Sequence, residues 1–455
     1  MFGNKILNYW NDIVRDLAVA VSIPSVCQEP EGIYPYGKET AKVLDTVLDM
    51  ARSYGLETKN VNYYAGHAEY GEGEENAVVM AHLDVVPPGD GWLASPYTLV
   101  QMEGCFYGRG VADNKGPAIV ALHCLRALKD AGVPARRKLR VVFGCGEEIG
   151  MDDMKHYFAS EQHPTMGFTP DGRYGVCHCE KGLLRFDVRG NASPVVRSFV
   201  SGTVVNAVPY KAKASLICSK EEYEQFISAA KKAKGRFDCR KTVEGLSVTS
   251  YGTASHAASP ERGFNAAAYL IDLIVSVFGS RAGTLFCFLR DAVGTAYDGS
   301  LYGVACEDEP SGPLTLNLGI VQADETEAHF SVDIRYPATK DGSRIAETLR
   351  QKTQDAGLIF DLISDEPPLY LPKDGPLVKL LSGAYEDITG QPCSIYSMGG
   401  GTYARQMFGR GVAFGANFEG YKSDAHNCNE HIRVENLKLH AQICLEAMYR
   451  MLTAE

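Results

Sequence analysis

A strand, a helix and a second strand follow one another in the first third of the chain. Residues 76–83 (NAVVMAHL) form a short apolar run that ends in polar and Pro/Gly-rich sequence, which is typical of a buried strand. Residues 111–130 begin in a Gly-rich turn and continue with helical spacing, and residues 139–143 (LRVVF) form the next strand-like run. Two strands joined by a helix run parallel, because such a crossover returns the chain to the same end of the sheet. The order therefore predicts an α/β domain whose mostly parallel central sheet is covered by helices.

The sequence pattern changes near residue 180. Segments such as KGLLRFDVRG and EAHFSVDIRYP alternate apolar and polar residues, and amphipathic helical segments such as EEYEQFISAAKKAK lie between them. This pattern predicts an α+β domain whose antiparallel sheet has helices on one face. Helix and buried-strand patterns return from about residue 367. Since 455 residues are too many for one hydrophobic core, we expect a discontinuous domain of residues 1–180 and 366–455 into which residues 181–365 are inserted.

The charge balance and the N-terminal segment exclude two classes of partner. The chain has 45 basic and 56 acidic residues, a net charge of -11, and no Lys/Arg run that could follow a phosphate backbone, so nucleic acid is not expected. The first residues have apolar side chains at helical spacing, interrupted by Asp12, Arg15 and Asp16, and are interpreted as an amphipathic helix rather than a signal peptide. No window approaches the roughly 20 apolar residues that span a bilayer. We therefore expect a cytoplasmic protein that does not bind membranes.

The thirteen cysteines are scattered along the chain and are interpreted as reduced core residues. Cys177 and Cys179 form a C-x-C pair that would lie on one side of a strand, where zinc binding is an alternative. No second cysteine pair stands at zinc-finger spacing, so the structural interpretation of this pair is preferred.

Five short segments carry side chains of the kind that bind metal ions. Taken singly, each has an ordinary interpretation, such as a helix N-cap for Asp113 and a plain turn for Asp171. Taken together, two histidines and three carboxylates in loops after strands or before helices suit two zinc or manganese ions that share one bridging carboxylate. The segments are His82-Leu83-Asp84, Gly108 to Gly116 around Asp113, Glu147-Glu148, Pro170-Asp171-Gly172 and Asp424-Ala425-His426.

Two of these segments offer more than ligands. Asp84 follows His82 by two residues and can accept the second ring N–H of a metal-bound histidine, which fixes its tautomer. Glu147 and Glu148 are adjacent and can divide two tasks, one as a metal ligand and one as a proton shuttle. The residues therefore indicate acid–base chemistry beside a metal centre.

Several longer blocks carry a family resemblance. AHLDVVPPGDGW, YGRGVADNKGP, GCGEEIGMDDM, TPDGRYGVCHCEKG, SHAASPERGFNAA, DIRYP and GGGTYARQMFGRGVAFGANFE occur in this order over most of the chain. They resemble the aminoacylase/carboxypeptidase/desuccinylase family of metallopeptidases, and within it the peptidase V type of bacterial dipeptidase. The resemblance implies a metal-binding catalytic domain (1–180 and 366–455) with an inserted lid domain (181–365).

The resemblance also assigns the residues of the metal centre. It implies two divalent ions, zinc with manganese or cobalt as alternatives. His82 and Asp171 would hold one ion, Glu148 and His426 the other, and Asp113 would bridge them, commonly through a cis peptide to the next residue. Glu147 would be the general base that takes a proton from the attacking water, and Asp84 the partner of His82.

In the lid the resemblance assigns three further residues. His256 would polarise the scissile carbonyl, and Asn206 and Arg335 would contact substrate, Arg335 through the terminal carboxylate. The substrate would be a small peptide, a dipeptide with a free amine and a free carboxylate. The lid is longer than that of dimeric desuccinylase-like members, which implies a monomer.

Alternatives and departures stay open at this point. An N-acyl-amino-acid deacylase or desuccinylase would use the same residues, and a non-catalytic binding protein could keep the same fold. A serine hydrolase would need a G-x-S-x-G motif, which the sequence lacks. Asn114 stands where many relatives have a second aspartate, and Gly146 where an acidic or polar residue is frequent. Neither change removes a ligand.

Overall fold

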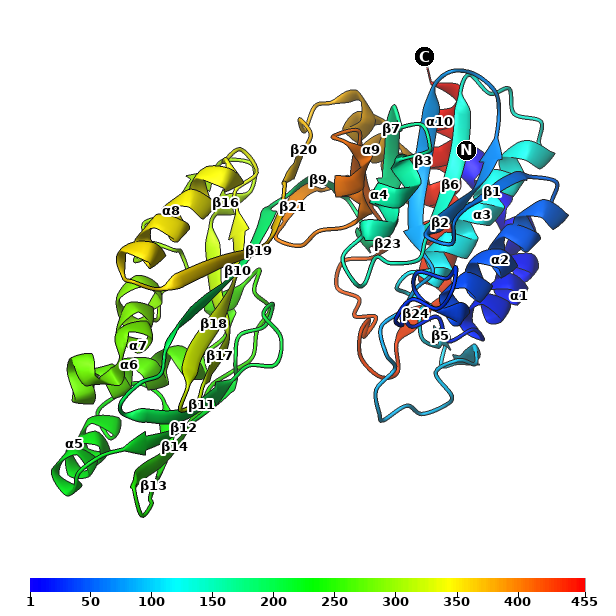
Figure 1. Cartoon of the computed structure of the whole chain (residues 1–455). Coiled ribbons are helices and arrows are strands. Elements are labelled where there is room, and N and C mark those ends of the chain that lie inside the picture. Colours follow the sequence, from blue (N-terminus) through cyan, green and yellow to red (C-terminus); the bar gives the residue numbers. More distant parts are fainter. Residues whose placement is uncertain (455) are drawn as a thin grey trace. The chain divides into compact units, whose positions relative to one another are not determined.

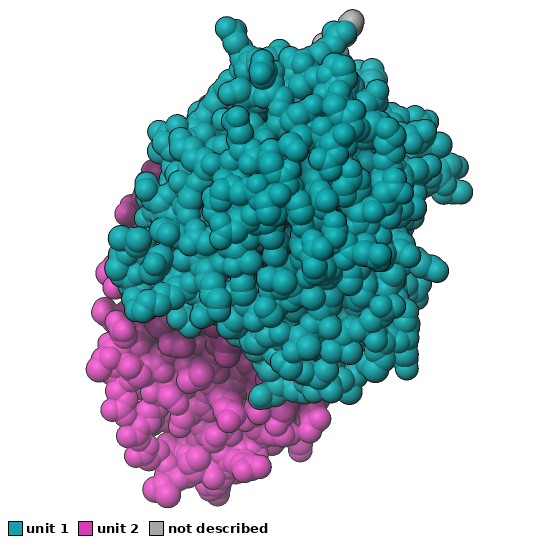
Figure 2. Space-filling view, turned by 90° about the vertical axis from the view of Figure 1, so that its right-hand side faces the viewer, with its two compact units in different colours: residues 1–178, 370–396, 401–455 teal, residues 179–369, 397–400 magenta. Residues whose placement is uncertain are grey.

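The computed structural model describes residues 1–454, which form two compact units (Figures 1 and 2). Unit 1 contains residues 1–178, 370–396 and 401 onward, and unit 2 contains residues 179–369 and 397–400. The predicted fold class is confirmed, because unit 1 has a sheet with parallel strands and unit 2 a separate antiparallel sheet. The chain passes from unit 1 to unit 2 after residue 178 and returns to unit 1 at residue 370, whereas the domain boundaries after residues 180 and 365 stay a prediction. The short segment 397–400 belongs to unit 2 rather than to the α/β domain.

The central sheet has nine strands and begins with the order β1-β2-β6-β3-β7-β22-β9, and β20 (Leu369–Tyr370) and β21 (Ile395–Met398) both pair with β9. Its inner strands β6, β3, β7 and β22 run parallel, and the other pairs in this order are antiparallel. The strands are β1 (Glu57–Val61), β2 (Ala65–Tyr70), β3 (Asn76–His82), β6 (Lys138–Gly144), β7 (Met166–Thr169), β9 (Val176–Glu180) and β22 (Gly411–Phe414).

All seven residues of β3 are buried, because helices cover the sheet on both faces. Ala77, Val79 and Ala81 point into a large core with the helices of one face, while Val78 and Met80 point into a smaller core on the other face. The first core packs under α1 (Trp10–Val21), α2 (Lys38–Ser53), α3 (Lys115–Asp130) and α10 (Val434–Thr453), and the second under α4 (Asp152–Phe158) and the 3-10 helix η5 (Tyr403–Met407). A continuous apolar run is therefore what this strand requires.

The N-terminal segment begins with a 3-10 helix, η1 (Phe2–Tyr9), before α1, so the predicted amphipathic helix is two helices in sequence. Across residues 1–454, no helix combines the length and the apolar character that crossing a bilayer requires. No disulfide joins any of the thirteen cysteines, all of which lie within residues 1–454, and Cys177 and Cys179 are buried.

Unit 2 is built on an eight-stranded sheet in which every neighbouring pair is antiparallel, with the order β13-β14-β12-β11-β17-β18-β10-β19. The strands are β10 (Gly182–Asn191), β11 (Val196–Ser201), β12 (Lys211–Ile217), β13 (Arg236–Lys241), β14 (Gly245–Tyr251), β17 (Thr315–Ala323), β18 (Glu327–Tyr336) and β19 (Ile359–Glu366).

Helices cover only one face of this sheet. Figure 1 shows α5 (Lys220–Ala230), α6 (Ala266–Phe278), α7 (Thr284–Phe288) and α8 (Gly342–Asp355) on the same side of the strands. Leu184, Phe186 and Val188 of β10 point into the core under these helices. Because side chains alternate along a strand, the residues between them, such as Arg185, lie on the other face. That open face carries polar and charged side chains.

Candidate metal centre and substrate-binding residues

The predicted metal ligands of unit 1 meet at one edge of the central sheet. His82 is the last residue of β3, Glu147 and Glu148 follow β6, and Asp171 follows β7. Since β3 is parallel to both β6 and β7, the carboxyl ends of all three strands lie at the same edge, the edge at which ligands bind in such sheets. The remaining two ligands come from loops, Asp113 from the turn before α3 and His426 from the segment before β24 (His431–Arg433).

Asp113 lies between the two histidines. Its Oδ1 atom is 3.0 Å from Nε2 of His82, and its Oδ2 atom is 3.0 Å from Nε2 of His426. Asp171 Oδ2 is 3.9 Å from Nε2 of His82, and Glu148 Oε1 is 3.1 Å from Nε2 of His426. The ligand atoms thus form two groups that share one carboxylate, with a separate oxygen for each group.

This geometry fits two metal ions. Within each group the ligand atoms lie within 4.8 Å of one another. Tetrahedral zinc holds nitrogen and oxygen ligands at roughly 2.0–2.2 Å, which separates the ligand atoms from each other by about 3.3–3.6 Å. Imidazole nitrogens and carboxylate oxygens are donors that zinc, manganese and cobalt accept. The donor atoms are therefore of the right kind and at the right spacing for divalent cations.

The charge of the site also suits a cation. Burial and the neighbouring carboxylate of Asp113 raise the pKa of Asp171 to about 7. Burial, and then the charge of Asp171, raise the pKa of Glu147 well above its usual value. Hydrogen bonds to Asp113 and Glu148 raise the pKa of His426 to about 11. Crowded carboxylates disfavour their own ionisation, and divalent cations supply the compensating charge.

Asp84 is fully buried and connects His82 to the glutamate pair. The ring atom Nδ1 of His82 lies 2.9 Å from the backbone carbonyl oxygen of Asp84 and 3.4 Å from its carboxylate. The backbone carbonyl is thus the nearer acceptor for this ring N–H, and the carboxylate accepts the backbone N–H groups of Glu147 at 3.3 Å and of Glu148 at 3.0 Å. Asp84 thereby fixes both the histidine ring and the turn that presents the two glutamates.

Asn114, which stands where many relatives have a second aspartate, makes a structural contact. The peptide bond between Asp113 and Asn114 is cis, as the resemblance implied. The side-chain amide of Asn114 donates a hydrogen bond of 2.9 Å to the carbonyl oxygen of Pro170, the residue before Asp171. An ionised aspartate could not donate here, so the asparagine ties the bridging ligand to the segment of another ligand.

A buried ion pair that the sequence analysis did not identify supports the same loops. The carboxylate of Glu430 accepts four hydrogen bonds, from the backbone N–H groups of Gly110, Ala112 and Asp113 at 2.9–3.0 Å and from Nη1 of Arg109 at 2.7 Å. Nη2 of Arg109 donates to the carbonyl oxygen of Asn427 at 3.1 Å. The two side chains are 0–1% exposed. This pair, which we call the Arg109–Glu430 clamp, holds the Asp113 turn against the segment that follows His426.

Three predicted residues lie in unit 2. His256 forms an isolated β-bridge with Ala207, and the backbone N–H of Ala257 donates to the carbonyl oxygen of Asn206 at 2.9 Å, so the loops of Asn206 and His256 are neighbours. The backbone N–H of Ala258 donates to Nδ1 of His256 at 3.1 Å. Partial burial and the charge of Arg335 lower the pKa of His256, so the ring is neutral and carries its proton on Nε2.

Arg335 is buried and already holds three acceptors. Its Nε and Nη2 atoms donate to the carboxylate of Asp333 at 2.5 and 3.0 Å, and its Nη1 atom donates to the carbonyl oxygen of Gly399 at 2.9 Å. The two-pronged edge of the guanidinium that suits a carboxylate is thus occupied by Asp333. Part of the hydrogen-bonding capacity of Nη1 and Nη2 remains for substrate.

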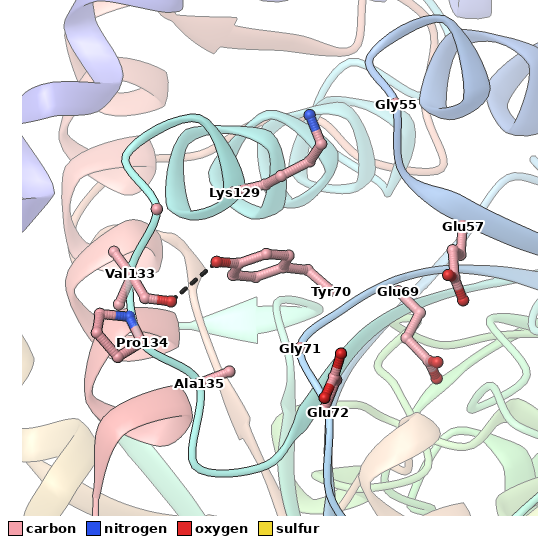
Figure 3. A pocket seen from close by; sticks show the side chains of 11 residues that line it. Gly55, Glu57, Glu69, Tyr70, Gly71, Glu72, Lys129, Val133, Pro134 and Ala135 are labelled. Carbon is pink, nitrogen blue, oxygen red and sulfur yellow. Dashed lines mark hydrogen bonds between the residues drawn. The ribbon is translucent and has the colours of Figure 1, made fainter.

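A pocket of about 520 Å³ on unit 1 lies apart from the ligand groups (Figure 3). It is formed by the end of β2 and the loop before β6, where the hydroxyl of Tyr70 donates to the carbonyl oxygen of Val133 at 2.9 Å. Tyr70 pairs with Leu139 at the start of β6, so the pocket lies at the amino-terminal edge of the parallel strands. The predicted metal ligands lie at the opposite edge, and the pocket is therefore not part of their site.

Comparison with known proteins gives consistent matches. The model of the peptidase family M20/M25/M40 matches residues 78–450. A protein of Bacillus subtilis strain 168 named "Putative dipeptidase YtjP" is 32% identical over 464 residues, which covers 98% of each chain. Among solved structures, the di-peptidase Dug1p from Saccharomyces cerevisiae has a TM-score of 0.59 at 14% identity and covers 100% of this chain and 98% of its own. Human carnosine dipeptidase 1 has a TM-score of 0.58 at 14% identity and covers 98% of each.

Proposed function

The chain belongs to the peptidase family M20/M25/M40, a family of metal-dependent hydrolases, and we propose that it is a two-metal dipeptidase. One observation carries the proposal. Asp113 directs one carboxylate oxygen to each of two histidines, and Glu147 stands beside the ligand group without belonging to it. A bridged metal pair with an adjacent free carboxylate would suit the hydrolysis of an amide by water.

The protein residues would divide the work as follows. His82 and Asp171 would hold one ion, Glu148 and His426 the other, and Asp113 both. When bound, the two divalent ions, zinc with manganese or cobalt as alternatives, supply Lewis acidity and make water a nucleophile near neutral pH. The carboxylate of Glu147 would take a proton from the attacking water and later deliver it to the leaving amine. Its position is fixed by the backbone hydrogen bond to Asp84.

Unit 2, the proposed lid, would supply further substrate-contacting residues. The Nε2–H of His256 would donate to the oxygen of the scissile carbonyl, since Nδ1 is already occupied by the backbone N–H of Ala258. Loss of such a donor typically costs about 100- to 1000-fold in rate. Asn206, whose loop lies against that of His256, would orient the same substrate, and Arg335 would attract its terminal carboxylate. Closure of the lid would exclude water from the reaction.

The substrate class is tested by comparing an unblocked dipeptide with its N-acetylated counterpart. Each is incubated with zinc- or manganese-loaded protein, and the reaction is repeated after a chelator is added. We expect cleavage of the free dipeptide alone and its loss on chelation. Preference for the acetylated compound would move the assignment to an N-acyl-amino-acid deacylase, with the same residues in the same roles.

The extended second unit supports a monomeric enzyme. Its eight-stranded sheet and four helices are more than the minimal lid through which relatives dimerise, as the resemblance implied. Sedimentation should give a single species at the chain mass of 49.5 kDa. A stable dimer would contradict this part of the proposal.

A further inference from the structure

A second guanidinium lies beside Arg335 on the open face of the unit 2 sheet. Arg185 of β10 stands directly opposite Asp333 of β18, and Asn317 of β17 stands opposite Asp333 on the other side. Arg335, two residues beyond Asp333 on the same strand, points to the same face because side chains alternate along a strand. Strands β10 and β18 therefore place two arginines and one aspartate together, and β17 adds Asn317 beside them.

Asp333 is fully buried and is shared by both arginines. Its carboxylate accepts from Nε and Nη2 of Arg335 and from Nε of Arg185 at 3.0 Å. One negative charge thus faces two positive charges, and the cluster keeps a net charge of +1. Such an excess of positive charge on a partly buried surface favours an anion.

The two arginines differ in what they have left to offer. Arg335 is buried and uses all three of its nitrogens. Arg185 uses only Nε, its side chain is 31% exposed, and neither of its Nη atoms has a partner within residues 1–454. The four Nη N–H groups of Arg185 are therefore available, in the planar geometry that binds a carboxylate through two parallel hydrogen bonds.

The cluster lies close to the predicted substrate-contacting loops of the same unit. Asn317 donates from its side-chain amide to the carbonyl oxygens of Val205 at 2.8 Å and Ala207 at 3.0 Å, which flank Asn206. Thr315 donates to the carbonyl oxygen of Ala257, the residue after His256, at 3.3 Å. Both arginines are near enough to lower the pKa of His256 by their charge. An anion held by Arg185 would thus lie beside the imidazole.

We propose that Arg185 binds a carboxylate of the substrate, beside Arg335. The proposal rests on the proposed dipeptidase function and adds a specific residue to it. A substrate carboxylate can come from the C-terminal α-carboxylate or from an acidic side chain, and the experiment below separates these sources. Arg185 is assigned to binding and to neither proton transfer nor metal coordination, so its loss should affect KM more than kcat.

The chain offers a matched control four residues further along the same strand. Arg189 lies on the same face of β10, but its Nε and Nη2 atoms both donate to Asp361. It is also an exposed arginine paired to an aspartate, and it has no place in the cluster around Asp333. Arg189→Met should therefore leave substrate binding unchanged while it repeats the loss of one surface charge.

The experiment compares Arg185→Met, Arg185→Lys and Arg189→Met with the unmodified protein. The substrates are Ala-Ala, Ala-Ala amide, Ala-Glu and Ala-Gln. We expect Arg185→Met to raise KM for Ala-Ala by roughly 10- to 100-fold, the range for hydrogen bonds to a charged group, with kcat within a few-fold. For Ala-Ala amide, KM should stay unchanged if Arg185 binds the α-carboxylate. A loss confined to Ala-Glu relative to Ala-Gln would assign the side-chain carboxylate instead. Arg185→Lys should restore part of the affinity.

Two outcomes overturn the proposal. Equal losses on all four substrates would make Arg185 a structural residue, and so would no loss on any of them. The same variants are also titrated, free of metal, with Ala-Ala and its amide by calorimetry, which measures binding without turnover. If the unmodified protein hydrolyses none of the dipeptides, the proposed function fails, while the calorimetric difference still decides the role of Arg185. Because Arg335 holds Asp333 through two hydrogen bonds, Asp333 keeps a charged partner in Arg185→Met and in Arg185→Lys.

Discussion

The Arg109–Glu430 clamp gives the sharpest prediction. Glu430→Gln keeps the size of the side chain and replaces one carboxylate oxygen with an NH2 group. Whichever way the amide is oriented, two of the four N–H donors that face Glu430 would meet another donor. Each buried donor left without an acceptor costs about 1–3 kcal/mol, and breaking a buried ion pair costs about 3–5 kcal/mol. We therefore expect the free energy of unfolding to fall by about 3–5 kcal/mol.

The same substitution should weaken metal binding, because either orientation of the amide leaves part of the turn of the proposed bridging ligand Asp113 without an acceptor, at Ala112 and Asp113 or at Arg109 and Gly110. Changes to groups that position a metal ligand typically reduce metal affinity by about 10- to 100-fold. Zinc affinity is measured by competition with a chromogenic chelator, and stability by urea unfolding of the metal-free protein. Glu435→Gln is the control, since Glu435 is exposed in the first turn of α10, only five residues away. If Glu430→Gln bound zinc as tightly and unfolded at the same urea concentration as the control, the clamp would have no such role.

Three further predictions concern single residues. Glu147→Ala should retain both metals by elemental analysis and lose about 100- to 10,000-fold in kcat. Normal turnover by this variant would show that Glu147 is not the general base. His256→Ala should unfold like the unmodified protein and lose about 100- to 1000-fold in kcat with little change in KM, so an unchanged kcat would remove its assignment to the carbonyl oxygen. The imidazole of His440 is buried, and its Nδ1 atom is hydrogen-bonded to the hydroxyl of Tyr174. Burial lowers the pKa of His440 to about 3. Between about pH 6.5 and 3 the unfolded chain therefore binds a proton at His440 that the folded chain does not, and stability falls as the pH drops. Between pH 6.5 and 5 the free energy of unfolding should fall by about 2 kcal/mol from this residue. His440→Gln should lack that part of the pH dependence in urea titrations. If the variant showed the same pH dependence as the unmodified protein, the proton would be taken up at another residue.

The elements that follow from local sequence were predictable. Residues 76–83 have an uninterrupted apolar run because helices cover both faces of the strand, and that run places His82 at its end. The alternation in residues 182–191 likewise reflects a sheet with one covered face. The pairing of ligands into two groups was available only from the family resemblance, since spacing along the chain contains no information on which oxygen faces which histidine.

The contacts between distant segments could not be predicted. Arg109 and Glu430 are 321 positions apart, and each alone is an ordinary charged residue in a polar turn. The environment of Arg335 could be predicted in part from the sequence, since Asp333 lies two residues away on the same strand and therefore on the same face. The third member, Arg185, lies on another strand, and only the register of β10 against β18 brings it to Asp333.

The order of the strands has a consequence for synthesis on the ribosome. In the sheet of unit 1, β22 lies between β7 and β9, although about 230 residues separate it from β9 in the sequence. While the intervening unit 2 is translated, the edge of β7 has no neighbour on that side, and such an edge can pair with other chains. Residues 426 and 430, which supply the last ligand and the clamp, follow β22. A nascent chain therefore gains its full set of proposed metal ligands only in the final stage of translation, and truncated products that end before this segment would lack His426 and leave the second ligand group incomplete.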